Sequence, residues 1–260
     1  MKILSKMTIA GALLGTWTLV AQAEQVKVGI SAEPYPPFSS LDASGKWVGW
    51  EIELIGAICS EAKLECIINP VSWDGIIPSL TSKKIDVIMS SMSITKERKK
   101  TIGFSDKYYS DSSYVVAGPK GLAMDPTSEG LKGKILGVQV STNGQIYASK
   151  HFGNSLAEIK TYQTQDEANQ DLVAGRIDAV LASPITIGQF LNTEQGKACC
   201  RKKGTVANDP EIMAPGVGAG LRKGDTELRE KINAAIKGIR AKGKYDKITK
   251  KYFDFDIYGG

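Results

Sequence analysis

A short pattern occurs twice in the chain and limits the folds that it can adopt. Residues 84–91 have the sequence KIDVIMSS, and residues 176–183, 92 positions later, have RIDAVLAS. Each copy follows an aspartate, Asp74 or Asp166, that precedes a leucine by six positions. A helix-strand unit that is present twice predicts two similar α/β lobes. The alternative is a chance similarity between two ordinary helix-strand units.

The same alternation of strands and helices continues along the chain. Residues 26–30 alternate apolar and polar side chains as a strand does, and apolar residues then recur at helical spacing: Trp50, Leu54, Ile58 and Ala62. Further strands are predicted at 66–71, 86–89, 114–117, 135–138 and 179–181. This order predicts one or two mainly parallel sheets with helices between the strands. Near the C-terminus we expect a helix with one apolar stripe, Ile232, Ala235, Ile236 and Ile239, and then a short helix to about Phe253.

The first 23 residues have the parts of a secretory signal peptide. Lys2 and Lys6 precede an apolar run over residues 7–20, and an Ala-Gln-Ala sequence ends at Ala23. We expect cleavage after Ala23 and export to the periplasm. An N-terminal membrane anchor is the alternative, but the run is shorter than the roughly 20 residues that a span needs.

The mature chain has the size and composition of a globular protein. Removing 23 residues from 260 leaves 237, enough for two lobes or one large α/β domain. With 42% apolar and 23% charged residues, the chain has sufficient core material, which excludes disordered and fibrous classes. The net charge of +5 includes two leader lysines, and the remaining +3 is too small to indicate nucleic-acid binding.

Export gives the four cysteines a structural meaning, because disulfides persist in oxidising compartments. A helix that ends between Cys59 and Cys66 would bring their sulfurs together, so we expect a disulfide there. Cys199 and Cys200 are adjacent, and a bridge between neighbours is strained; free thiols, a vicinal disulfide and links to another chain all stay open. His151, the only histidine, has no ligand-type neighbour at suitable spacing, so we expect neither a metal site nor a cofactor.

Both copies of the repeated pattern end in small hydroxyl residues, Ser90 and Ser91 in the first and Ser183 in the second. The carboxyl ends of parallel strands face the ligand crevice in α/β sheets. If the two lobes face each other, these serines line one cleft from opposite sides and can bind a small polar ligand. Serines are also common in turns.

Six motifs occur in the same order and register as in one protein family. They are YPPF at 35–38, VGWEIEL at 48–54, IPSL at 77–80, SSMSIT at 90–95 followed by Arg98, AGRID at 174–178 and KYFDFDIYGG at 251–260. These motifs resemble the periplasmic amino-acid-binding proteins of polar amino-acid ABC transporters, over nearly the whole mature chain. The similarity is greatest to the lysine/arginine/ornithine and histidine binders, whose short disulfide after the first helix matches Cys59 and Cys66.

The resemblance implies an α/β fold of the two-lobed, type II periplasmic-binding-protein (venus-flytrap) class. Lobe 1 would comprise residues 24–114 and 210–260 and lobe 2 residues 115–209, with two chain crossings as the hinge. The implied function is capture of arginine, lysine, ornithine, histidine or a derivative for uptake, without catalysis. The ligand would close the lobes by binding the closed state more tightly. The closed monomer would then dock on a membrane permease.

Arg98 is the strongest candidate for a ligand-binding residue. Its guanidinium is a rigid fork that matches a carboxylate, and in the family the arginine of this motif holds the ligand α-carboxylate. We expect Thr95 to cap the helix that carries Arg98, and Ser91 and Ser93 to bind the same end of the ligand. Without the resemblance, Arg98 would be interpreted as a surface arginine.

Two aromatic residues, Tyr35 and Trp73, match family positions that enclose the ligand's aliphatic or cationic stem. An indole face suits a cation, although both rings could instead be core aromatics. Glu33 could meet the distal positive charge of a ligand. In related cationic binders, however, the acid lies three residues before the tyrosine rather than two.

In the second lobe, the sequence QVSTNG at 139–144 follows a strand and is expected to begin a helix, whose N–H groups would face an anion. Thr142 matches a ligand-binding position of the family, and Gln139 and Asn143 are further candidates. Asn143 and Gly144 replace the threonine and glutamine that are usual there.

Ser183 departs from the family, which usually has an aspartate at this position that pairs with the ligand α-ammonium. A serine supplies no countercharge, and the loss of a buried charge partner weakens binding by more than a neutral hydrogen bond contributes. Opine-binding relatives also resemble this chain in having an uncharged residue there, so an opine is an alternative ligand. A water or Asp166 could replace the acid, which keeps arginine and lysine as candidates.

An enzyme on the same scaffold is a second class of function, because cyclohexadienyl dehydratases resemble these binders. Dehydration needs a general acid in the cleft, and Glu33 is the only obvious candidate. A sensory protein that reports the ligand to a receptor would use the same binding step.

Overall fold

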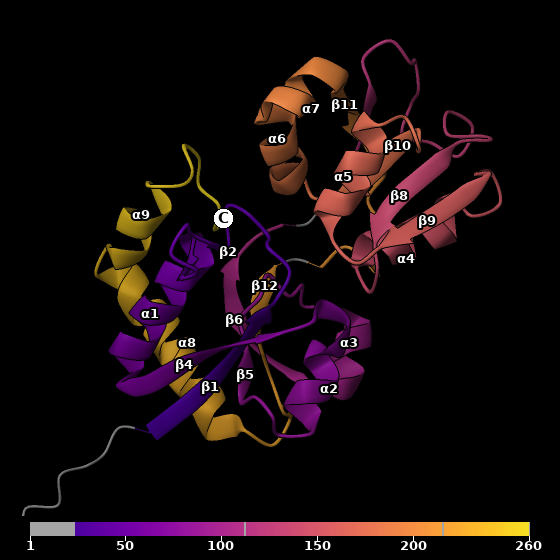
Figure 1. Ribbon diagram of the computed structural model, residues 1–260. Helices are drawn as coiled ribbons and strands as arrows, with labels where there is room; N and C mark the ends of the chain where they lie inside the picture. Colours follow the sequence, from indigo (N-terminus) through magenta and orange to yellow (C-terminus); the bar gives the residue numbers. More distant parts are fainter. Residues whose placement is uncertain (1–23, 112, 215, 260) are drawn as a thin grey trace, which may run out of the picture.

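The computed structural model describes residues 24–111, 113–214 and 216–259, so the predicted signal peptide lies outside the described residues. The chain forms two α/β lobes, each built around one five-stranded sheet (Figure 1). The strand order is β4-β1-β5-β12-β6 in lobe 1 and β11-β7-β10-β8-β9 in lobe 2. The chain passes from lobe 1 to lobe 2 between β6 and β7, and returns between β11 and β12.

Lobe 1 combines both ends of the described chain. Its elements are β1 (Glu24–Ser31), β2 (Ser40–Leu41), β3 (Trp47–Val48), α1 (Trp50–Ala62), β4 (Leu64–Val71), the 3₁₀ helix η1 (Trp73–Gly75), α2 (Ile76–Thr81), β5 (Val87–Ile88), α3 (Lys96–Thr101), β6 (Gly103–Tyr109), β12 (Val217–Leu221), α8 (Thr226–Ala241) and α9 (Lys244–Thr249). Lobe 2 contains β7 (Val115–Pro119), β8 (Ile135–Gln139), α4 (Asn143–Phe152), β9 (Glu158–Tyr162), α5 (Gln165–Val173), β10 (Ala179–Ala182), α6 (Pro184–Asn192), α7 (Glu194–Cys199) and β11 (Cys200–Thr205).

Both sheets are mixed, but four of the five strands in each run in the same direction, in agreement with the prediction of mainly parallel sheets; only β12 and β7 are reversed. Strands β4, β1 and β5 run parallel, as do β10, β8 and β9. Strand β12 is antiparallel to β5 and β6, and β7 is antiparallel to β10 and β11. The double crossing explains this arrangement, because a strand that leaves a lobe and the strand that returns to it run in opposite directions.

The repeated Ile-Asp pattern forms the same structure in both lobes. Asp86 accepts a hydrogen bond from the backbone N–H of Lys27 on β1 at 3.0 Å, and its own N–H donates to the Lys27 carbonyl at 2.8 Å. Asp178 makes the same two bonds with Ile135 on β8, at 2.8 and 3.0 Å. Each aspartate therefore ties the start of one strand to its neighbour, and the sequence repeat corresponds to a structural repeat.

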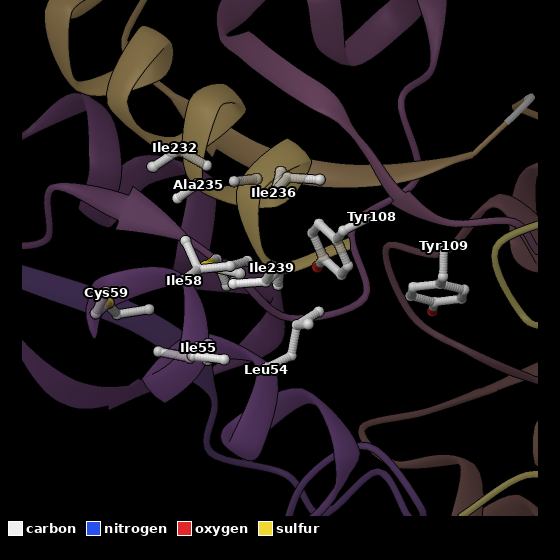
Figure 2. Packing of buried hydrophobic residues seen from close by; sticks show 14 of the residues in the cluster. Leu54, Ile55, Ile58, Cys59, Tyr108, Tyr109, Ile232, Ala235, Ile236 and Ile239 are labelled. Carbon is white, nitrogen blue, oxygen red and sulfur yellow. The ribbon is translucent and has the colours of Figure 1, made fainter. Parts of the chain in front are cut away.

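The core of lobe 1 lies between α1, α8 and the sheet (Figure 2). Helix α1 contributes Leu54, Ile55 and Ile58, and the facing side of α8 contributes the predicted stripe: Ile232, Ala235, Ile236 and Ile239. The last helix, α9, ends at Thr249 rather than near Phe253, and the chain continues through turns. These helices keep the sheet's cleft-facing strand ends in fixed positions.

Two disulfides are present. Cys59 at the end of α1 is bonded to Cys66 in β4, with Cα atoms 6.1 Å apart, as predicted. Cys199 and Cys200 are bonded to each other. The single histidine, His151, lies beside Asp209, with 2.8 Å between Nε2 and Oδ2.

None of the helices in the described ranges is long and apolar enough to cross a membrane. Over the same part of the chain, no group of three or more His, Cys, Asp or Glu side chains is placed to hold a metal ion.

Candidate ligand-binding site

A cavity lies between the two lobes, at the carboxyl ends of the parallel strands. We call it the interlobe cavity. All eleven residues that the sequence suggested for ligand binding line it: Glu33, Tyr35, Trp73, Ser90, Ser91, Ser93, Arg98, Gln139, Thr142, Asn143 and Ser183. Their contact with a ligand stays a prediction. Asp166 does not line the cavity: it is exposed on α5 and accepts a hydrogen bond from Gln170 at 3.3 Å.

Arg98 is held in the cavity by a short capped helix. The side chain of Thr95 accepts a hydrogen bond from the Arg98 N–H at 3.1 Å and begins α3, as predicted. The guanidinium donates to the Ser93 carbonyl at 3.1 Å and lies over Trp73, 5.4 Å from the ring centroid. Burial lowers the pKa of Arg98 to about 10, so it remains a cation at neutral pH. No carboxylate of the described residues lies within ion-pair distance of it.

Among the described residues, hydrogen bonds connect the lobes across the cavity at two places. Trp73 Nε1 and Arg98 Nη2, both from lobe 1, donate to the carbonyl of Ser141 in lobe 2, at 3.2 and 3.4 Å. The Thr186 hydroxyl on α6 donates to the Tyr35 hydroxyl at 2.7 Å. The lobes are therefore in contact at two separate points beside the cavity.

The serine loop after β5 is positioned by a buried glutamate that the sequence gave no role. Ser91 has a left-handed φ of 52°, and both its N–H (2.7 Å) and its hydroxyl (3.0 Å) donate to Glu51. The Tyr108 hydroxyl also donates to Glu51, which is only 1% exposed. Burial raises the pKa of Glu51, and these three hydrogen bonds oppose the rise. Glu51 thus fixes the conformation of the loop that faces the cavity.

Glu33 lies at the lobe 1 edge of the cavity and accepts two hydrogen bonds. Its Oε2 atom receives the Ser31 hydroxyl at 2.6 Å and the Trp73 N–H at 3.0 Å. These bonds orient the start of η1 and keep the indole of Trp73 over the cavity.

The opposite wall is the beginning of α4. The Thr142 hydroxyl caps this helix: it accepts from the Gln145 N–H at 3.2 Å and donates to the Gln139 carbonyl at 2.7 Å. Its one proton is therefore used within lobe 2. Asn143 is 4% exposed, and among the described residues its side-chain nitrogen has no well-formed hydrogen bond, although the Tyr114 hydroxyl lies close to this side chain. A buried donor of this kind is placed to bind an acceptor in the cavity.

The sequence missed Asp111, which lines the cavity beside Ser183. Ser183 caps α6, accepting the Thr186 N–H at 3.3 Å, and makes a side-chain hydrogen bond with Asp111. Burial raises the pKa of Asp111 to about 7, and the Ser183 bond partly opposes this. Burial and the charge of Asp111 together raise the pKa of Tyr35 to about 12. Asp111 lies in the segment between β6 and β7, and a segment that joins two lobes passes the floor of the cleft between them.

Other lining residues of the interlobe cavity had no predicted role. They are Ser31, Pro34, Tyr114, Gly144, Gln165, Leu181 and Ala182. The combination of one cation, two carboxylates, hydroxyls and aromatic faces suits a small zwitterion better than an apolar ligand.

Several known proteins are similar to this chain. An L-arginine-binding protein of Pseudomonas aeruginosa is 41% identical over 260 residues, covering 98% of this chain and 99% of that protein. A histidine-binding periplasmic protein of Salmonella typhimurium is 43% identical over 237 residues, covering 90% of each. The solved structure of a Salmonella typhimurium periplasmic binding protein described for high arginine specificity has a TM-score of 0.80 and 31% identity, covering 89% of this chain and all of that one.

The family model for bacterial extracellular solute-binding proteins, family 3, matches residues 26–255. This match covers both lobes and the two crossings between them. The chain therefore belongs to family 3 of the bacterial extracellular solute-binding proteins.

Proposed function

We propose that this chain is the periplasmic binding component of an ABC transporter and that it captures a cationic amino acid, with arginine, lysine, ornithine and histidine as candidates. The observation that carries the proposal is the pair of donors that meet in the cavity. Arg98 comes from lobe 1 and the Asn143 amide from lobe 2. A ligand carboxylate that accepts from both would hold the lobes together, which is the differential binding that closure requires.

Three other residues that line the cavity favour a ligand with a cationic side chain. Trp73 and Tyr35 offer aromatic faces, and Glu33 offers a carboxylate that accepts two hydrogen bonds through one oxygen. A flat guanidinium or an ammonium would stack on the indole and approach the carboxylate. The names of the similar proteins agree with this chemistry, since one binds L-arginine and one binds histidine.

The proposal includes how the ligand is delivered. The segment 1–23 serves as a signal peptide, the mature monomer collects the ligand in the periplasm, and the closed form docks on a membrane permease. The relatives named for the periplasm support this location. No cofactor takes part.

A calorimetric titration of the mature protein with the twenty amino acids and ornithine tests the proposal. We expect binding of the basic amino acids and much weaker binding of the neutral and acidic ones. Agmatine, which is arginine without its carboxylate, is the matched ligand control and should bind at least about tenfold more weakly, because it cannot accept from Arg98. Equal affinity for agmatine and arginine would contradict the proposal.

An opine such as octopine is the second candidate ligand. Ser183 favours it, because an uncharged side chain at this wall of the cavity leaves room beside a substituted nitrogen. Competition between octopine and arginine in the same titration decides between the two. The Ser183→Asp variant should shift the preference toward free arginine or lysine.

We propose that the protein binds its ligand without catalysing a reaction. Glu33, the acid that a dehydratase would need from the sequence alone, accepts two hydrogen bonds and is not arranged as a proton donor. The direct test is incubation with prephenate and arogenate. We expect both to be recovered unchanged, and turnover of either would establish the enzyme instead.

A further inference from the structure

The charged side chains that line the interlobe cavity differ in the number of hydrogen-bond partners that they have. Two carboxylates, Glu33 and Asp111, and one cation, Arg98, lie among its described lining residues. Glu33 has two protein donors on one oxygen. Asp111 has the Ser183 hydroxyl as its hydrogen-bonding group. A single neutral donor leaves most of the acceptor capacity of a carboxylate unused.

We propose that Asp111 receives the ammonium nitrogen of the ligand, so that capture of the ligand releases a proton from its carboxyl group. The inference rests on the proposed function, because it requires an amino-acid-type ligand. It assigns the countercharge to the segment that joins the lobes rather than to α6, where Ser183 has none.

The surroundings of Asp111 explain why a proton is involved. Its neighbours are mainly hydroxyl groups, Tyr35, Tyr109, Tyr114 and Ser183, contributed by both lobes and by the first crossing. The cavity also holds Glu33 and Arg98, whose charge acts on Tyr114. A groove on the outer side of Asp111 is lined by Lys250 and Lys251. No cation of the described residues lies within ion-pair distance of Asp111.

Such an environment favours the protonated acid, and the pKa of Asp111 is raised to about 7 by burial. At neutral pH roughly half of the molecules then carry the proton. A ligand ammonium beside Asp111 favours the ionised form. The step is balanced: the protonated carboxyl and the ammonium give a carboxylate–ammonium pair, and the released proton passes to the solvent.

The position of Asp111 also connects the charge of its carboxylate to closure of the two lobes. The Ser183 hydroxyl that contacts Asp111 belongs to the N-cap residue of α6, and the first turn of this helix carries Thr186, which bonds to Tyr35 of lobe 1. A charge formed on Asp111 therefore acts on the point where lobe 2 meets lobe 1. Ionisation by the ligand would strengthen the Ser183 hydrogen bond, because charge-assisted bonds are stronger than neutral ones.

The test is calorimetry with L-arginine at pH 6, 7 and 8, in two buffers of different ionisation enthalpy, which counts the protons released. The wild-type protein should release roughly half a proton at pH 7, and its affinity should rise roughly tenfold from pH 6 to pH 8. Asp111→Asn should release none, bind arginine with a flat pH profile, and lose at least about tenfold in affinity at pH 8.

Matched variants separate Asp111 from other acids. Asp166→Asn removes an exposed carboxylate of α5 and should behave as wild type in every respect. Glu33→Gln removes the other cavity carboxylate and should weaken arginine binding while the proton release persists. His151 does not line the cavity, and His151→Gln should leave the proton count unchanged.

A second ligand keeps the test valid if Asp111→Asn does not fold. Nα-acetyl-L-arginine has no ammonium at this position, so the wild-type protein should bind it without proton release and with little dependence on pH. Proton release that is equal for both ligands would overturn the proposal, and so would an unchanged proton count in a folded Asp111→Asn. If the wild-type protein binds no amino acid, the proposed function fails and this inference falls with it. If it binds arginine without proton release, only the inference fails.

Discussion

Arg98 combines burial with charge, and its neighbours explain how. Its guanidinium is held between the Ser93 carbonyl, the Ser141 carbonyl and the indole of Trp73. These groups accept hydrogen bonds or face the cation, but none neutralises it. The remaining donors of the fork are therefore available to a carboxylate.

Replacing Arg98 with alanine should remove carboxylate binding. The loss of one partner of a buried charge pair costs about 2–5 kcal/mol, so we expect arginine affinity to fall at least about thirtyfold in calorimetry. Arg201, exposed on β11, provides the matched control, and Arg201→Ala should bind normally. Normal affinity in the Arg98→Ala protein would place Arg98 outside the site.

Asp111 should make the ligand-free protein less stable as pH rises. The folded state holds its proton up to pH 7, whereas an unfolded aspartate releases it near pH 4. Between these values the folded state binds more protons, so the free energy of unfolding falls with increasing pH, by a few kcal/mol at most. Chemical denaturation of wild type and Asp111→Asn at pH 4, 5.5, 7 and 8 checks this. The variant should gain stability relative to wild type as the pH rises, and parallel curves would contradict the assignment.

At the level of single residues, the sequence motifs predicted many of the residues that line the cavity but not Asp111. The residues of the SSMSIT and QVSTNG segments meet because strand ends meet, which a strand-helix pattern predicts. Asp111 could not be found in the same way. It follows two tyrosines in a Ser-rich connection that has the composition of an ordinary turn, and its burial depends on α6, 72 residues further along the chain.

Among the secondary-structure elements, α3 shows how a six-residue helix can present a functional side chain. Such a helix is too short to be stable alone. Its start is fixed by the Thr95 cap, and the chain before it is held by the contact of Glu51 with Ser91. Cap and buried glutamate together set the direction from which Arg98 enters the cavity.

Thr95→Ala should therefore lower both stability and affinity. Loss of an N-cap costs about 1 kcal/mol, and part of this loss should appear as weaker arginine binding because Arg98 becomes less well positioned. Thr193→Ala removes a similar cap from α7, where Thr193 accepts the Gly196 N–H at 3.0 Å outside the cavity. It should cost similar stability with no change in affinity. Equal affinity losses in the two variants would argue against a specific role for α3.

The Cys59–Cys66 disulfide should affect stability alone. It joins Cys59 near the end of α1 to Cys66 near the beginning of β4. The cavity lies at the opposite end of β4. A loop of this length predicts about 2–3 kcal/mol. The Cys59→Ser/Cys66→Ser double variant should unfold at a lower denaturant concentration and still bind arginine as wild type does. A large affinity loss would mean that the bridge supports the site.

The elements that the sequence did not predict share a physical cause. Strands β6, β9, β11 and β12 carry many glycines or charged residues, such as VGAGL in β12 and CRKKGT in β11. They are strands because neighbouring strands pair with them. For β6, β11 and β12 this pairing follows from the passage of the chain through the hinge, and β9 pairs with β8 within lobe 2. Helices α1 and α8 were predictable because their apolar stripes are local features of the sequence.

At the scale of the whole molecule, closure depends on few contacts. Two hydrogen bonds reach the Ser141 carbonyl from lobe 1, and one joins Tyr35 to Thr186. Each is worth about 1 kcal/mol in water, so changing one should shift the balance between open and closed lobes measurably.

Trp73→Phe should favour the open form. The phenyl ring keeps an aromatic face but lacks the Nε1 donor to Ser141, and a loss of about 1 kcal/mol shifts the closed-to-open ratio roughly fivefold. Small-angle X-ray scattering of the ligand-free protein should show a larger radius of gyration than wild type. Trp47→Phe changes a tryptophan of β3 that packs on the lobe 1 core and should leave the radius unchanged. An unchanged radius in Trp73→Phe would show that this bond does not hold the lobes together.

The acceptor at Ser141 is a peptide oxygen, and every amino acid has one. No substitution at position 141 can remove this oxygen. Sequence changes can therefore alter the two hydrogen bonds to it only through their donors, Trp73 and Arg98. Because Arg98 also faces the cavity, selection for a different ligand and selection for a different balance between open and closed lobes would act on the neighbouring side chains of Trp73 and Arg98. Relatives that diverge in the ligand they bind should therefore also diverge in how strongly the ligand-free protein favours the closed state.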